Sequence, residues 1–204
     1  MYRHKTPALL SKIFPDVLLK MPSDKNEIYL TFDDGPIPEV TDRVLDELNK
    51  FSVPATFFMV GDNIQKHKEI YSRVVSCGYS VGNHSYNHLN GWKTKTINYI
   101  DNINKCEAIL DTSSRLFRPP YGRMQWLQYK KIKRHYRIVM WDVLSGDFDQ
   151  SISEEKSLNA CIQATTSGSI IVFHDSLKSE QKLKYILPRY LEHFGSKGYQ
   201  FKLL

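Results

Sequence analysis

The chain has 204 residues, of which 41% are hydrophobic and 25% charged, so its composition excludes a disordered tail protein and predicts one globular domain. A chain of this length buries roughly 70% of its unfolded surface, which is enough for a core without disulfide or metal staples. The three cysteines, Cys77, Cys106 and Cys161, are far apart and match no CxxC spacing. Their placement argues against both a disulfide framework and a thiolate zinc site.

The net charge of +6 is modest, and its densest basic run lies at residues 130–137. Stacking aromatic residues are not interleaved with this run in the pattern of nucleic-acid platforms, so we predict a solvated helix face and no nucleic-acid partner. No apolar stretch approaches the ~18 residues of a membrane helix, and residues 1–5 are not followed by a signal-peptide core. These features predict no integral membrane segment and a cytoplasmic location by default, with the cell envelope as the alternative. They leave the oligomeric state open.

Short apolar runs alternate with amphipathic stretches along the chain. Strands are predicted at residues 28–32, 55–60, 80–82, 116–118, 138–141, 170–173 and 199–203. Helices are predicted at residues 40–51, 64–75, 97–109, 125–134, 154–164 and 183–194. Repetition of strand, helix and strand favours an α/β fold with a parallel sheet, either open and doubly wound or closed as a barrel.

Polar residues follow five of the predicted strands, at the edge where α/β folds gather their active sites. The first motif, TFDDGP, places Asp33 and Asp34 before a Gly-Pro turn, although this spelling alone is also typical of turn chemistry. The second, HSYNH, places His84 and His88 four residues apart. On a helical turn this spacing aims two imidazoles at one metal, but surface and cap histidines also adopt it.

Three further motifs follow later strands. RPPYG begins at Arg118, and its two prolines fix the backbone that follows the guanidinium. WDVLSGD offers two carboxylates, Asp142 and Asp147, just past a strand. The apolar run IIVF ends at His174, which taken alone is typical of a structural histidine.

Together the five strand ends predict a metallohydrolase. A set of two histidines and one carboxylate, which leaves coordination positions open for water and substrate, would consist of His84, His88 and Asp34. Asp33 can take a proton from that water, and Arg118 can pair with it and relieve its repulsion with the neighbouring carboxylate. His174, oriented by a carboxylate, is placed to act as the general acid.

The order and spelling of these motifs resemble the polysaccharide deacetylases of the NodB homology type, carbohydrate esterase family 4. The similarity runs from about residue 28 to the C-terminus and includes TFDDGP, HSYNH, RPPYG and the apolar run before His174. The resemblance implies a single-domain, distorted (β/α)7-type barrel. Residues 1–27 would form an N-terminal capping segment, and residues 28–204 the catalytic domain.

The resemblance also implies a role for each matched residue. The metal ligands would be Asp34, His84 and His88. Asp33 would be the catalytic base, held by Arg118, and the backbone N–H of Tyr121 would help to stabilise the oxyanion. His174 would protonate the leaving amine, with Asp147 against it. The implied reaction is hydrolysis of an N-acetyl group, less often an O-acetyl group, on a carbohydrate such as an N-acetylglucosamine polymer, with zinc as the expected metal and cobalt or nickel as alternatives.

Three positions depart from the family pattern: Leu144 replaces an aspartate, Phe148 a tryptophan and Val172 a leucine of the acetyl pocket. Asp142 is a rival for the carboxylate partner of His174, since it too follows a strand end. These departures leave open a catalytically silent glycan-binding relative. A hydrolase of small amides on the same fold is a third reading, against which the presence of Asp33 argues. Trp92 could stack on a sugar ring or serve in packing.

Overall fold

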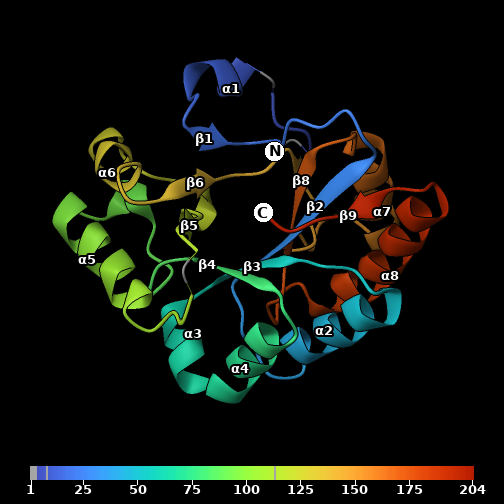
Figure 1. The fold of residues 1–204 in the computed structure, drawn as a ribbon, viewed down its shortest axis with the longest axis horizontal. Coiled ribbons are helices and arrows are strands. Elements are labelled where there is room, and N and C mark those ends of the chain that lie inside the picture. Colours follow the sequence, from blue (N-terminus) through green and yellow to red (C-terminus); the bar gives the residue numbers. More distant parts are fainter. Residues whose placement is uncertain (1–3, 8, 113) are drawn as a thin grey trace.

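The computed structural model describes residues 4–7, 9–112 and 114–204, and it shows a parallel sheet curled into an open barrel with helices around it (Figure 1). The strands are β1 Val17–Leu18, β2 Glu27–Asp33, β3 Thr56–Met59, β4 Ser80–Asn83, β5 Leu116–Phe117, β6 Arg137–Val139, β7 Val143–Leu144, β8 Ser169–His174 and β9 Gln200–Phe201. Their order is β1-β6-β5-β4-β3-β2-β8-β7, with β9 beside β2. The predicted single-domain distorted barrel is confirmed.

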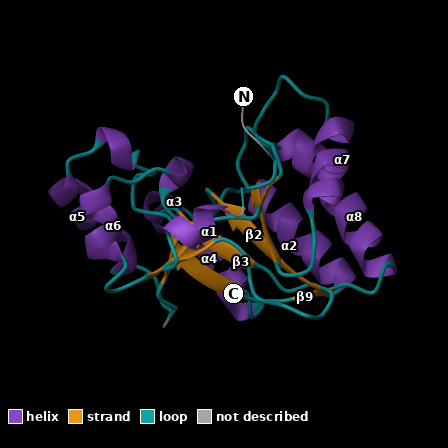
Figure 2. Ribbon diagram, turned by 90° about the horizontal axis from the view of Figure 1, so that it is seen from above, coloured by secondary structure: helices purple, strands orange, loops and turns teal. Residues whose placement is uncertain are grey.

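The helices pack outside the sheet (Figure 2). They are α1 Leu9–Ile13, α2 Val40–Phe51, α3 Gly61–Lys66, α4 Lys68–Ser76, α5 Thr96–Glu107, α6 Trp126–Ile132, α7 Glu154–Ala164 and α8 Glu180–Ser196, with short 3-10 turns η1 Gly91–Lys93 and η2 Pro120–Gly122. The single helix predicted over residues 64–75 is two helices, because His67 between them has φ −128° and ψ 53°. In the described part of the chain, no helix is both long and apolar enough to cross a membrane.

The central strands are buried on both faces, which is why they read as continuous apolar runs rather than as alternating patterns. Phe32 of β2 stacks on Phe57 of β3 and on Phe173 of β8, with ring centroids 5.1 and 5.8 Å apart. β2 and β8 pair in a register that sets Asp33 opposite His174. A packed core therefore fixes the strand ends on which the polar motifs lie.

The N-terminal segment joins the sheet at the gap between β6 and β7. Lys5 forms an antiparallel bridge to Val143 of β7, and β1 pairs in parallel with β6. The ammonium of Lys5 also lies 2.6 Å from Oδ2 of Asp142. Lys5 and β1 thus contact the two strands that flank the gap, while a domain boundary at residue 27 stays a prediction.

Candidate active site

A cleft of about 950 Å³ opens over the carboxyl ends of β2, β4 and β8. It is lined by predicted site residues from separate strand ends, namely Asp33, Asp34, His84, His88, Tyr121 and His174. Arg118 and Asp147, the other two predicted site residues, lie buried directly behind this lining. The fold therefore brings all eight residues together.

The candidate metal centre consists of Asp34, His84 and His88, whose ligand atoms all lie within 4.8 Å of one another. Oδ1 of Asp34 lies 3.1 Å from Nε2 of His88 and 3.7 Å from Nε2 of His84. This oxygen is buried, yet it accepts no hydrogen bond of good geometry from any described residue. A buried carboxylate oxygen facing two imidazole nitrogens fits a divalent cation.

The electrostatics of this centre agree with that fit. Burial lowers the pKa of His84 to about 4, against the opposing charge of Asp33, so the imidazole is neutral, as a metal ligand must be. Burial alone would raise the pKa of Asp34, but His88, His174 and His84 together hold it below its usual range. The site therefore presents one anionic and at least one neutral donor at neutral pH.

The backbone of HSYNH is not the helical turn that the spacing suggested. Ser85 and His88 both have left-handed backbones, with φ values of 62° and 54°, and no helix is assigned to this segment. The two rings still converge, with centroids 5.0 Å apart. Left-handed φ values are uncommon away from glycine and are concentrated at functional sites. Asp34 and Tyr121 share this conformation, with φ values of 85° and 59°.

Two residues that the sequence analysis missed support the loop that carries Asp34. Nδ2 of Asn63 donates to the carbonyl of Asp34 at 2.7 Å, and the N–H of Gly35 donates to Oδ1 of Asp175 at 3.1 Å. The other oxygen of Asp175 accepts from the hydroxyl of Thr41 at 2.6 Å. Burial, helped by the charge of Asp34, raises the pKa of Asp175 to about 8. A Cβ added to Gly35 would lie 2.0 Å from Oδ2 of Asp175, so only glycine fits there.

Asp175 directly follows His174, so its place in the same motif was an available signal. Asn63 lies on α3 outside every motif, and nothing in its sequence context marks it.

Arg118 is fully buried and connects two parts of the site. Its Nη1 lies 2.6 Å from Oδ1 of Asp33, its Nη2 donates to the carbonyl of Met140 at 2.8 Å, and its guanidinium lies 4.1 Å from the ring centroid of Phe58. The backbone carbonyl of Arg118 accepts from Nδ1 of His84 at 2.8 Å. That bond assigns the proton of His84 to Nδ1 and leaves Nε2 free to face Asp34.

Asp147, and not its rival Asp142, is the carboxylate against His174. Nδ1 of His174 donates to Oδ1 of Asp147 at 2.8 Å, and the backbone N–H of His174 donates to Oδ2 at 2.7 Å. Asp142 instead pairs with Lys5 and accepts from the hydroxyl of Ser169 at 2.6 Å. Burial opposes protonation of His174, but Asp147 and the other acidic groups outweigh it and raise the pKa to about 9.

The remaining predicted positions differ in their access to the cleft. Leu144 and Phe148 line it, whereas Val172 is completely buried within β8 and is not part of the lining. The ring centroid of Tyr121 lies 4.6 Å from that of His88, and the backbone N–H of Tyr121 donates to no group in the described part of the chain. Trp92 is 61% exposed, although its indole N–H donates to the carbonyl of Met124 at 3.2 Å.

Comparison with known proteins identifies relatives over most of the chain. A peptidoglycan-N-acetylglucosamine deacetylase of Bacillus cereus is 36% identical over 160 residues, which cover 76% of this chain and 58% of that protein. A second protein of that name and organism is 31% identical over 190 residues, covering 91% of this chain and 89% of that protein. A bifunctional xylanase/deacetylase of Pseudobutyrivibrio xylanivorans is 32% identical, but this chain spans only 29% of it.

Comparison with solved structures identifies the same class of protein. A peptidoglycan N-acetylglucosamine deacetylase bound to 4-naphthalen-1-yl-N-oxidanyl-benzamide superposes with a TM-score of 0.89 at 32% identity, covering 98% of this chain and 95% of that one. A pseudoenzyme of carbohydrate esterase family 4 from Bacillus anthracis has a TM-score of 0.79 at 24% identity over 91% of this chain and 66% of that one, which shows a common fold alone. The sequence profile of the polysaccharide deacetylases matches residues 20–136, more than half of the chain. The chain belongs to the polysaccharide deacetylase family.

Proposed function

We propose that this protein hydrolyses the N-acetyl group of an acetylated saccharide with the help of a divalent cation held by Asp34, His84 and His88. The observation that carries the proposal is the arrangement of two carboxylates with opposite tasks. Asp33 is tied to buried Arg118 at 2.6 Å, while Oδ1 of Asp34 faces two imidazoles and accepts no hydrogen bond of good geometry from the described residues. A binding module has no need of both carboxylates.

Each residue then has a defined task. A bound cation supplies Lewis acidity and makes water acidic enough to lose a proton near neutral pH. Asp33 receives that proton, and Arg118 fixes the carboxylate in position to do so. The free N–H of Tyr121 donates to the oxygen of the tetrahedral intermediate, where charge develops. His174, protonated at neutral pH because its pKa is about 9, gives its proton to the leaving amine.

Zinc is the metal we propose, because nitrogen and carboxylate ligands with open positions suit catalytic zinc, and cobalt or nickel could replace it. The relatives are named as peptidoglycan-N-acetylglucosamine deacetylases, which supports an N-acetylglucosamine-containing wall glycan as substrate. The cell envelope would then be the place of action.

The test is acetate release from N-acetylglucosamine oligomers and from peptidoglycan by the zinc-loaded protein. We expect chelation to stop the reaction and zinc, cobalt or nickel to restore it. Asp33→Asn should abolish turnover while retaining zinc, and Asp24→Asn, an exposed aspartate outside the cleft, is the matched control. Glycan binding without acetate release on both substrates would instead identify a silent relative, for which Leu144 and Phe148 in the cleft are the structural argument.

A further inference from the structure

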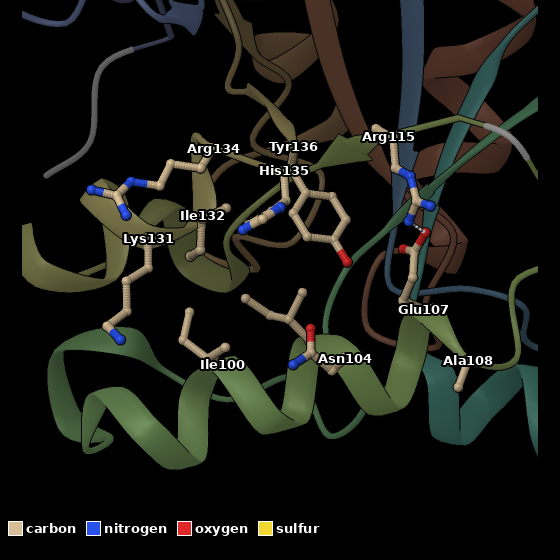
Figure 3. A pocket seen from close by; sticks show the side chains of 11 residues that line it. Ile100, Asn104, Glu107, Ala108, Arg115, Lys131, Ile132, Arg134, His135 and Tyr136 are labelled. Carbon is tan, nitrogen blue, oxygen red and sulfur yellow. Dashed lines mark hydrogen bonds and ion pairs between the residues drawn. The ribbon is translucent and has the colours of Figure 1, made fainter.

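A second hollow, of about 750 Å³, lies between α5 and the segment that leads from α6 to β6 (Figure 3). It shares no lining residue with the catalytic cleft. Its apolar surface comes from buried Ile103 and Ile132 and from half-buried Ile100. The volume falls within the range of small-molecule sites, roughly 300–1,000 Å³, and such sites combine an apolar base with a few polar groups.

Two cations, Lys131 and Arg134, and the imidazole of His135 border this hollow without partners in the described part of the chain. The side chains of Lys131, Arg134 and His135 make no hydrogen bond or ion pair with any residue in the described ranges. Figure 3 places Lys131 and Arg134 at one side of the opening, with His135 between Arg134 and Tyr136. The two cations are three residues apart in the chain, and neither has a counter-charge in the described part of the chain.

The helix dipole accounts for only one of these cations. Lys131 lies in the last turn of α6, where a positive charge is favoured. Arg134 and His135 lie beyond Ile132, the last residue of that helix. Their position next to the hollow therefore needs another explanation.

The acidic residue in the lining does not neutralise them. Oε1 of Glu107 is paired with Arg115, and Oε2 accepts from Nδ2 of Asn83 at 3.3 Å. Figure 3 shows the Glu107–Arg115 pair at the opposite side from Lys131 and Arg134. The hollow thus has an apolar base. At one end Glu107 and Arg115 form an ion pair, and at the other end the positive charge has no counter-charge.

We propose that this hollow binds a phosphate-bearing saccharide or polyol. A phosphate monoester carries a charge of about −1.5 to −2 near neutral pH, which matches several cations better than a single carboxylate does. The planar fork of Arg134 suits two phosphate oxygens, and Lys131 adds a point charge. The isoleucine side chains match the carbon face of a ring, and Asn104 offers its amide to hydroxyls.

The inference is independent of the proposed deacetylase activity, so its failure leaves that activity untouched. The experiment is calorimetric titration of the metal-free, full-length chain with N-acetylglucosamine 6-phosphate, glycerol 3-phosphate, inorganic phosphate, N-acetylmuramic acid and neutral N-acetylglucosamine. We expect binding of at least one of the two phosphorylated organic ligands, and weaker binding of inorganic phosphate, of the carboxylate sugar and of the neutral sugar.

Paired substitutions localise the binding. Lys131→Gln with Arg134→Gln should weaken binding of the phosphorylated ligand by about a hundredfold, since each of the two charged contacts removed corresponds to about tenfold. Lys68→Gln with Lys156→Gln removes the same charge from exposed positions outside the hollow and should leave affinity unchanged. Both variants should deacetylate a neutral oligomer at the wild-type rate.

Four outcomes would overturn the proposal: absence of binding by both phosphorylated organic ligands, equal weakening in the two paired variants, equal affinity for N-acetylmuramic acid, or equal affinity for inorganic phosphate. The second would indicate unspecific attraction to a basic protein. The last two would indicate a general anion site in which the saccharide or polyol part of the ligand does not contribute to affinity.

Discussion

Replacing Asp147 by Asn should move the alkaline limb of the pH profile to lower pH. The pKa of His174 is about 9, compared with an ordinary value of 6.5, and Asp147 is the main group that raises it against burial. The difference of about 2.5 pH units corresponds to about 3.4 kcal/mol in favour of the protonated ring. Without that carboxylate, only the more distant charges of Asp34 and Asp33 oppose the effect of burial on the pKa of His174. We therefore expect the alkaline limb of kcat/KM to fall by about two pH units or more.

The substitution also removes one of two hydrogen bonds. Asp147 accepts from both Nδ1 and the backbone N–H of His174, whereas an asparagine side chain offers a single acceptor oxygen. A cation at Asp34 would offset the part of the pKa shift that comes from that carboxylate, but it leaves the share of Asp147 in place. NMR titration of the His174 ring in the metal-free protein measures the same shift without relying on turnover.

The pH dependence of the free energy of unfolding tests the pKa of His174 independently, and the direction of the change can be stated in advance. Because the pKa of His174 is higher in the folded protein, its contribution to the free energy of unfolding is complete below pH 6.5 and is lost as the pH rises through about 9. The difference between wild type and Asp147→Asn in urea unfolding should be largest below pH 6.5 and shrink at high pH. An unchanged alkaline limb together with an unchanged NMR pKa would refute the assignment of Asp147 as the group that holds the acid.

Three further substitutions test other contacts. Asp33→Asn should lower kcat by about 10²-fold or more with little change in zinc affinity. Competition with a chromophoric chelator measures that affinity, and loss of zinc would mark Asp33 as a ligand instead. Asp175→Asn should weaken zinc binding by about tenfold, because one of its two bonds supports Gly35 beside Asp34, and undiminished affinity would contradict that support. Lys5→Gln should cost about 1 kcal/mol or less in urea unfolding, since this side chain is 42% exposed, and should leave kcat/KM unchanged.

The motifs at the strand ends could be predicted because parallel strands bring distant sequence segments to one edge. Asp33 and His174 lie 141 positions apart in the chain but face each other in register. The sequence left the partner of His174 undecided between Asp142 and Asp147, since both follow a strand. What decides it is β7, a strand of two residues that is too short to produce a periodic pattern.

Other features depend on contacts that no local pattern encodes. The convergence of His84 and His88 rests on left-handed backbone at Ser85 and His88 rather than on helical periodicity. Lys5 and β1 pair with strands more than a hundred positions later, so their place in the sheet follows from the gap between β6 and β7. The support of Asp34 by Asn63 likewise arises only once α3 packs beside β2.

Buried Arg118 contacts both Asp33 and His84, so one residue positions two parts of the site. Its guanidinium sets the position of Asp33, and its carbonyl sets the ring of His84, so the distance between the proposed proton acceptor and the proposed metal ligand depends on a single residue. Loops around the cleft can then change in length and sequence to suit different glycans without altering that distance. Grafting a new substrate preference onto this protein should therefore begin in the loops and leave the end of β5 intact.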